Sequence, residues 1–146
     1  MGWIDLQGAT LAKMKERGGL WVVERVPSAG SARTTRWIAT AEPKSNVPKL
    51  ISQWAESGGV GDLPRGVQER LRAFDDAMRH AENLILIVHD AHLLRGETLD
   101  KMRLFAELGA AVVLEGDVSR IHVATENFPG FYQRAAYAVK VDRVFG

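Results

Sequence analysis

The sequence of 146 residues predicts one three-layer α/β domain, in which a mostly parallel sheet lies between helices. Continuous apolar runs at 84–88 and 111–114 are typical of buried strands in a parallel sheet. Long amphipathic segments alternate with such runs, which indicates crossover connections. Hydrophobic residues make up 46% of the chain and charged residues 25%, as in ordinary globular domains. A single domain spanning residues 1–146 is therefore expected.

The composition excludes several classes of protein. The chain has no cysteine, so it holds neither a disulfide framework nor a thiolate metal site. Its apolar runs are far shorter than the roughly 20 residues that span a bilayer, and its first residues lack the features of a secretory signal. A cytoplasmic protein without membrane contact is expected. The net charge is +1, but residues 1–49 carry eight Lys or Arg against four Asp or Glu, which makes this basic third a candidate surface for phosphates.

The first half of the chain is expected to hold a short helix followed by two strands. Apolar residues at helical spacing over 4–14 precede Gly18-Gly19, which ends the helix. The β-branched and aromatic run 20–26 predicts a strand, and the Pro-, Ser- and Gly-containing segment 27–31 predicts a loop. Residues 34–41 contain Thr, Trp and Ile, so a strand is favoured there over a helix.

The second half alternates helices and strands. Helices are predicted over 47–56, 67–78 and 97–108, and strands over 84–88, 111–116 and 137–141, with a shorter helical region before a break at Pro129-Gly130. Ligands of open parallel sheets bind beyond the carboxyl ends of the strands. Chemistry is therefore expected after the strands 20–26 and 84–88.

The residues after the second of these strands complete the most specific motif of the chain, Leu84-Ile85-Leu86-Ile87-Val88-His89-Asp90-Ala91-His92-Leu93-Leu94. It resembles the Walker B segment of AAA+ ATPases, in which an apolar strand ends in two adjacent acids and often continues Ala-His-Leu-Leu. Downstream, the strand end 114–117 and the segment 131–135 resemble the sensor and arginine regions of that family. Over residues 19–142 the chain is similar to the transposition-helper type, the phage Mu B and TnsC-like ATPases. The resemblance implies a P-loop NTPase-like fold, a sensor-like Asp117 and an arginine-finger-like Arg134.

The Walker B-like segment departs from the family at both acids. In such ATPases the first acid holds the magnesium shell and the second orients the attacking water. Aligned residue by residue, His89 replaces the first acid and Asp90 stands for the second. A neutral imidazole is a poor partner for magnesium, which prefers oxygen ligands. A slip of one residue puts Asp90 in the magnesium role, but Ala91 then leaves no acid for the water.

The phosphate loop departs further. A P-loop has the pattern Gly-x-x-x-x-Gly-Lys-Ser/Thr, whose backbone N–H groups surround phosphate. The matching segment 27–34 has Pro27 and Ala32 in place of the glycines and Arg33 in place of the lysine. If 34–41 is a strand, the helix that should follow the loop is missing too. We therefore expect a chain without an intact Walker A loop, and without the helical lid that follows the last strand in the family.

Three functional hypotheses follow. The first is a non-hydrolysing AAA+-like interaction domain, which is not an enzyme and has no cofactor. It binds a partner protein or its own kind. Its role is that of a regulator or adaptor of a DNA-associated machine, of the transposition, phage or mobile-element type. The second is an unorthodox ATP-binding protein or weak ATPase, in which Asp90 manages magnesium; it requires a loop and a helix over 30–41. Its phosphate-binding residues are Gly30, Ser31, Arg33 and Thr34. The third is a nucleic-acid-binding module, with Lys13, Lys15, Arg17, Arg25, Arg33 and Arg36 on one face.

Each candidate residue also has a purely structural interpretation. Asp90 suits the N-cap of the segment after it, and Asp117 suits a turn after Gly116. Arg134 suits a salt bridge on a solvated helix. His89 and His92 have poor spacing for a metal site. The four tryptophans are expected to serve the core or an oligomer interface rather than to stack on bases; they are Trp3, Trp21, Trp37 and Trp54.

Overall fold

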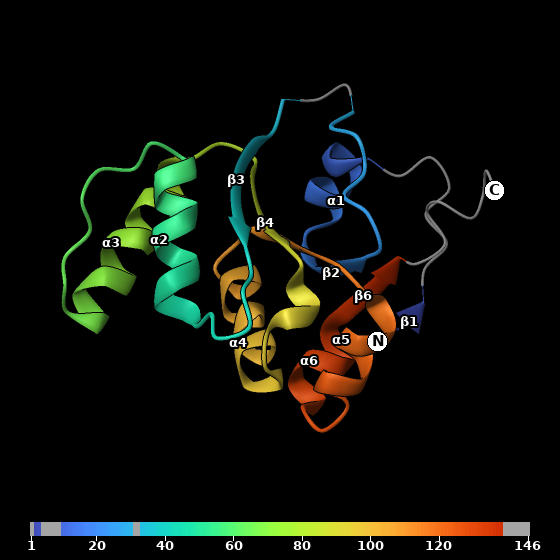
Figure 1. Cartoon of the computed structure of the whole chain (residues 1–146). Helices are drawn as coiled ribbons and strands as arrows, with labels where there is room; N and C mark the ends of the chain where they lie inside the picture. The colour runs from blue at the N-terminus through green and yellow to red at the C-terminus, as the bar shows by residue number, and fades with distance from the viewer. Residues whose placement is uncertain (1, 4–9, 31–32, 139–146) are drawn as a thin grey trace.

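The protein is built on one parallel sheet (Figure 1), seen in a computed structural model that describes residues 2–3, 10–30 and 33–138. The strands are β1 (Gly2–Trp3), β2 (Gly19–Val23), β3 (Thr35–Thr40), β4 (Leu84–His89), β5 (Ala111–Glu115) and β6 (Ala135–Ala138). Their order across the sheet is β1-β6-β2-β5-β4-β3, and every pair is parallel. The predicted α/β class and parallel sheet are confirmed.

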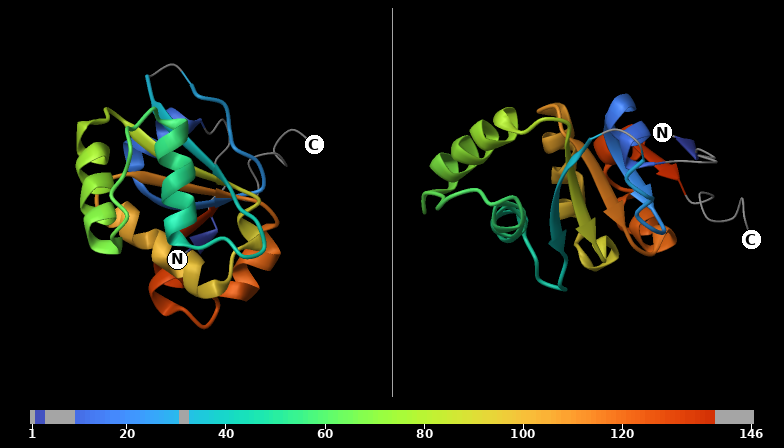
Figure 2. Two further views of the ribbon diagram at one scale, coloured as in Figure 1. Left: turned by 60° about the vertical axis from the view of Figure 1, so that its left-hand side comes forward. Right: turned by 90° about the horizontal axis from the view of Figure 1, so that it is seen from above.

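Helices cover both faces of this sheet. They are α1 (Leu11–Arg17), α2 (Val47–Ser57), α3 (Val67–His80), the 3₁₀ turn η1 (Ala91–Leu93), α4 (Gly96–Glu107), α5 (Val118–Thr125) and α6 (Pro129–Arg134). In the view from above, α3 stands out from the sheet beside α2 (Figure 2). None of the described helices is long and apolar enough to cross a membrane.

The larger core lies on the face covered by α2 to α6. Alternate side chains of the strands point to this face, because side chains of a strand alternate between the two faces. Leu86, Val88 and Leu114 are fully buried there, together with Trp54 of α2 and Phe131 of α6. This side of the sheet is a thick apolar layer that fixes the positions of α2, α4 and the carboxyl ends of the strands.

The smaller core lies on the opposite face and involves one described helix, α1. Leu11 and Met14 of α1 pack against the other set of alternating strand residues, Trp21, Val23, Ile85, Ile87, Ala111 and Val113. Thr10 caps α1, since its side chain accepts a hydrogen bond from the Lys13 backbone N–H at 3.2 Å. The helix thus lies before β2 in the chain, yet it covers the middle of the sheet.

The connection from β2 to β3 contains no helix in its described residues 24–30 and 33–34, and it bends at residues 24–25. Two backbone hydrogen bonds tie it to α1: Leu11 N–H donates to the Ser28 carbonyl at 2.8 Å and Ala12 N–H to the Ala29 carbonyl at 3.0 Å. The strand predicted at 34–41 is confirmed as β3. The part of the β2–β3 connection around Ser28 and Ala29 therefore lies against the start of α1.

The edge strand β3 is covered along its free side by α2. Gln53 accepts a hydrogen bond from Thr40 N–H at 2.8 Å and donates one to the Thr40 carbonyl at 3.1 Å. The Ser57 hydroxyl accepts from Ile38 N–H at 2.9 Å. These side chains satisfy backbone groups that would otherwise offer a template for another strand.

Several predicted boundaries differ from the observed ones. The strand predicted at 20–26 ends at Val23, where the chain bends. The last strand begins at Ala135 rather than 137, and its predicted end at 139–141 lies outside the described residues. The predicted break at Pro129 begins helix α6, because proline suits the first turn of a helix. The predicted helical residues 4–9 lie outside the described part of the chain, and the short strand β1 was not predicted.

Candidate functional site

The candidate site lies at the carboxyl ends of β4 and β5. The parallel register pairs Val88 with Leu114, so the next residues, His89 and Glu115, lie side by side. His89 Nδ1 is 2.9 Å from Glu115 Oε2, and the two side chains are 36% and 23% exposed. His89 and Glu115 come two residues after Ile87 and Val113, which face the smaller core. Because strand side chains alternate between the two faces, the pair lies at the rim of that same face.

The pairing defines what the imidazole can do. When Nδ1–H donates to the Glu115 carboxylate, Nε2 of His89 is the acceptor that is left. A carboxylate that orients an imidazole in this way fixes its ring and its tautomer. The pair can hold a proton or accept one hydrogen bond from a ligand. This His–Glu pair differs chemically from the two adjacent acids of the Walker B segment that residues 84–94 resemble.

Asp90 follows the pair in a left-handed backbone conformation, with φ 57° and ψ 37°. Its side chain is exposed and makes no capping hydrogen bond to η1, although its carbonyl accepts from Leu93 N–H at 3.0 Å. Asp90 therefore occupies the N-cap position of η1, as predicted, but its carboxylate does not cap the turn. The reason is geometric, because a capping side chain needs an extended backbone at this position.

His92 and Asp117 connect η1 to the start of α5. His92 Nδ1 accepts a hydrogen bond from Asp117 N–H at 3.1 Å, which assigns the ring proton to Nε2. Asp117 caps α5, since its side chain accepts from Arg120 N–H at 3.2 Å. Gly116 lies so close that an added Cβ would be 2.5 Å from His92 Nδ1. Asp117 therefore has a structural role, but as the N-cap of α5 rather than as the predicted turn residue.

The described residues hold no group of three or more His, Asp or Glu side chains arranged for a metal ion. Near the site, His89 faces Glu115 and His92 faces a backbone N–H. The two imidazoles therefore point to different partners.

The predicted phosphate-binding residues do not meet Asp90. Arg33 is exposed and Thr34 is half-buried, and both lie just before β3, whose first residue pairs with the first residue of β4. The Arg33 carbonyl accepts from Asn83 Nδ2 at 3.2 Å, also at the amino end of the strands. Asp90 lies beyond the opposite end, about 20 Å away or more, since a strand of six residues separates the two places. Ser31 lies outside the described residues.

Gly30 packs against α1 instead of forming a phosphate cradle with it. An added Cβ at Gly30 would be 2.7 Å from Thr10 Oγ1. The first N–H groups of α1 already donate to the carbonyls of Ser28 and Ala29. Free N–H groups at a helix start are what bind phosphate. Among the described residues, the predicted phosphate-binding groups and Asp90 therefore lie apart.

Arg134 lies on α6 and contacts α4 rather than the candidate site. Its Nε is 4.0 Å from Glu107 Oε1, and both side chains are about half exposed. Such a pair on the surface contributes little stability. The salt-bridge interpretation describes what Arg134 does within this chain.

The basic residues of the first third are spread over several elements. Lys15 donates to the Gly109 carbonyl at 2.9 Å, and the Arg17 guanidinium lies 5.7 Å from the centre of the Trp21 ring. Exposed side chains include Lys13 of α1, Arg25 of the loop and Arg36 of β3. Trp21, Trp37 and Trp54 are buried, as expected of core residues.

Sequence reasoning missed two features. Glu115 was noted as a strand end and not as the partner of His89, because the pairing depends on register. An apolar cavity between α2, α3 and α4 was missed altogether. In the sequence, Val67 and Leu71 are four residues apart and lie on one face of a helix. The structure leaves both side chains exposed, so this apolar pair was the available signal for the cavity.

Comparisons with known proteins support the fold. No family model and no curated protein sequence match the chain. The structure is similar to a chain of the Drosophila ORC structure, solved bound to GC-rich DNA and Cdc6, with a TM-score of 0.54 and 12% sequence identity. The match covers 88% of this chain and 51% of that one, so this chain spans about half the length of its neighbour. The similarity and the parallel sheet show an α/β fold shared with that chain, consistent with the predicted P-loop NTPase-like architecture.

Proposed function

We propose that this chain is an AAA+-like interaction domain that binds a partner and does not hydrolyse nucleotide. It acts as a regulator or adaptor of a DNA-associated machine, of the transposition, phage or mobile-element type that its sequence resembles. The observation that carries the proposal is the connection from β2 to β3. In place of a phosphate loop and its helix, the described residues of this connection form an irregular loop. The loop accepts two backbone hydrogen bonds from α1 and leads into a strand.

Phosphate binding and transfer depend on electrostatic stabilisation. A phosphoryl-transfer site needs several donors aimed at the same oxygens, in a place sheltered from water. Here Arg33 lies at the amino end of β3, and the first N–H groups of α1 bond to Ser28 and Ala29. The loss of the P-loop glycines and lysine from the sequence points the same way.

His89 disfavours magnesium binding at the end of β4. It takes the place of the acid that holds the magnesium shell, and it is bonded to Glu115 rather than left open for a ligand. Magnesium prefers oxygen ligands, of which Asp90 offers one carboxylate in an exposed turn. A fold can keep its architecture after such losses, because function resides in sites placed on it.

The experiment is a calorimetric titration of the protein with ATP and ADP, with and without magnesium. No heat and no thermal shift at millimolar nucleotide are expected. Micromolar binding that Arg33→Ala abolishes would contradict the proposal and support the nucleotide-binding hypothesis. Arg36→Ala is the matched control, since Arg36 is a nearby exposed arginine on β3 that the nucleotide hypothesis does not use.

Nucleic-acid binding by the basic third of the chain is tested separately with a labelled DNA duplex. Binding through phosphate contacts falls steeply with salt. The similar Drosophila protein was solved with GC-rich DNA, which makes a GC-rich duplex a sensible first probe. A steep salt dependence that Lys13→Ala and Arg36→Ala reduce would favour direct DNA binding. No binding at low salt would favour a role through protein contacts.

A further inference from the structure

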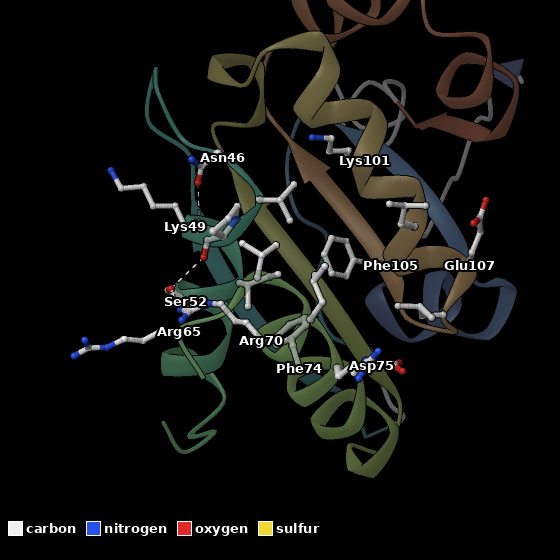
Figure 3. Close-up of a pocket in the computed structure, with 18 residues that line it drawn as sticks. Asn46, Lys49, Ser52, Arg65, Arg70, Phe74, Asp75, Lys101, Phe105 and Glu107 are labelled. Atoms are coloured by element: carbon white, nitrogen blue, oxygen red, sulfur yellow. Dashed lines mark hydrogen bonds between the residues drawn. The ribbon is translucent and has the colours of Figure 1, made fainter. Parts of the chain in front are cut away.

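An apolar cavity of about 970 Å³ opens on the helical side of the molecule, between α2, α3 and α4 (Figure 3). We name it the α3–α4 groove. Ile51, Phe74 and Phe105 form its buried floor. One wall is formed by Val67 and Leu71 of α3, which are 65% and 41% exposed. The other is formed by Leu104 of α4 and by Leu108 at its C-cap, which are 45% and 49% exposed.

The groove gathers most of the large hydrophobic side chains that are exposed in the described part of the chain. Six large hydrophobic side chains are exposed among the described residues, and four of them are these wall residues. Scattered exposed hydrophobic residues need no explanation, whereas a contiguous patch marks an interaction site. Each wall carries its two side chains four residues apart, on one face of its helix. Two such ridges with a valley between them form the kind of site that binds an amphipathic helix.

The groove is held in shape by the fold. Phe74 of α3 stacks on Trp54 at 5.9 Å and lies 5.6 Å from Trp37, between ring centres. Arg70 donates to the Ser52 hydroxyl of α2 and to the Pro64 carbonyl at 3.3 Å. These contacts anchor α3 at its middle, while Val67 and Leu71 stay exposed. A preformed site loses less entropy on binding than one that must order first.

The charges around the groove are mainly positive. Its lining includes five cationic side chains, Lys49, Arg65, Arg70, Arg72 and Lys101, and two acids, Asp75 and Glu107. The two acids pair with other cations: Asp75 with Arg79 at 3.0 Å and Glu107 with Arg103 at 3.4 Å. Arg65, Arg72 and Lys101 form no ion pair with a described residue. An acidic ligand would therefore find unpaired positive charge at the rim.

We propose that the α3–α4 groove binds an acidic amphipathic helix of a partner protein, with apolar side chains in the valley and Asp or Glu at the rim. This inference rests on the proposed function, since it names the surface through which the domain binds. A second copy of this chain fits less well. A two-fold interface would set this basic rim against itself, and like charges at an interface are costly.

The test uses a display library of helical peptides with a fixed apolar stripe and varied flanking residues, selected on the full chain. Enrichment of Asp and Glu at the flanks is expected. Leu71→Asp and Leu108→Asp should each weaken the selected peptides by about tenfold or more, since they put a charge among the anchors. The double variant Arg72→Glu with Lys101→Glu should weaken them by about tenfold at low salt and by less at high salt.

Two matched controls stay at wild-type affinity. Val123→Asp changes an exposed hydrophobic residue of α5 that does not line the groove, and Arg36→Glu reverses an exposed cation of β3. The proposal is overturned if no peptide is selected, if the flanks show no acidic enrichment, or if the groove variants bind as the controls do. It is also overturned if sedimentation shows a dimer that Leu71→Asp dissociates, since the groove then binds a second copy.

The peptide assay and the nucleotide titration have separate readouts. Peptide binding without nucleotide binding supports both proposals. Nucleotide binding together with groove-dependent peptide binding supports the nucleotide-binding hypothesis and keeps the groove. If the protein binds neither peptide nor nucleotide, the groove proposal is overturned and the proposed function is not.

Discussion

At the scale of single residues, the candidate site could be predicted only in part. His89 and Asp90 follow an obvious buried strand, so the sequence alone identifies them. The partner of His89 could not be predicted, because Glu115 comes beside it only through the β4–β5 register. A slip of one residue would move every side chain of the strand to the other face. The left-handed backbone conformation of Asp90 could not be predicted either, since aspartate adopts several conformations at a strand end.

The hydrogen bond between His89 and Glu115 gives the first prediction. Glu115→Ala should change the ring-nitrogen NMR signals of His89 and lower the free energy of unfolding by about 0.5–1.5 kcal/mol, because one half-buried hydrogen bond is lost. Glu115→Gln keeps an acceptor and should stay closer to wild type. Glu82→Ala, an exposed acid before β4, is the control. Unchanged His89 signals in Glu115→Ala would show that the pair does not form in solution.

The backbone of Asp90 gives the second prediction. Glycine adopts the left-handed region without the steric cost that other residues carry. Asp90→Gly should therefore leave the free energy of unfolding unchanged or raise it by up to about 1 kcal/mol. Asp90→Val should lower it by about 1–2 kcal/mol, because a β-branched residue is disfavoured there.

Urea denaturation measures both Asp90 variants. Asn83 has a similar φ of 51°, but its side chain bonds the Arg33 carbonyl, so Asn83→Gly should gain less than Asp90→Gly. Equal destabilisation by Asp90→Gly and Asp90→Val would contradict the observed conformation. If the glycine variant folds as expected, it also removes the Asp90 carboxylate for the nucleotide titration without a stability defect.

At the scale of elements, the sequence predicted the type of each main helix and strand better than its limits. The strand β3 is a clear case: Trp37 and Ala39 face the core while Arg36, Ile38 and Thr40 are exposed, as in a strand covered on one face. Its edge position and its cover by Gln53 could not be predicted. They depend on how α2 returns along the sheet, and a helical pattern does not specify that.

The contact between α4 and α5 gives a prediction at this scale. Gly96 begins α4, and an added Cβ would lie 2.3 Å from the Ala124 carbonyl oxygen of α5. Backbone must shift to admit it, so Gly96→Ala should lower the free energy of unfolding by about 1–3 kcal/mol. Gly61→Ala is the matched control, because nothing lies within 4 Å of its added Cβ and its φ is not positive.

The Gly61 control should be neutral or slightly stabilising, since alanine restricts the unfolded chain more than glycine does. Thermal and urea unfolding compare the two variants with wild type. If Gly96→Ala proved as stable as Gly61→Ala, α4 and α5 would pack less closely than the structure has them.

At the scale of the whole molecule, the three-layer parallel architecture could be predicted, but the assignment of helices to faces could not. Periodicity shows that a helix has an apolar side and does not show which sheet face it covers. The sequence indicated a missing helix between the first two strands. It did not indicate that α1, which precedes both, packs on the face that this loss leaves open. The α3–α4 groove likewise results from the assembly of three helices.

The role of α1 leads to the last prediction. Met14 is buried against the sheet through the smaller core, and both cores share the strands β2, β4 and β5. Met14→Ala should therefore lower the free energy of unfolding of the whole molecule by about 2–4 kcal/mol, in one transition that fluorescence and circular dichroism report together. Glu16→Ala, on the exposed side of the same helix, should change it little. Loss of helical signal at unchanged sheet stability would instead mean that α1 is an appendage, and that the strands hold together without a cover on that face.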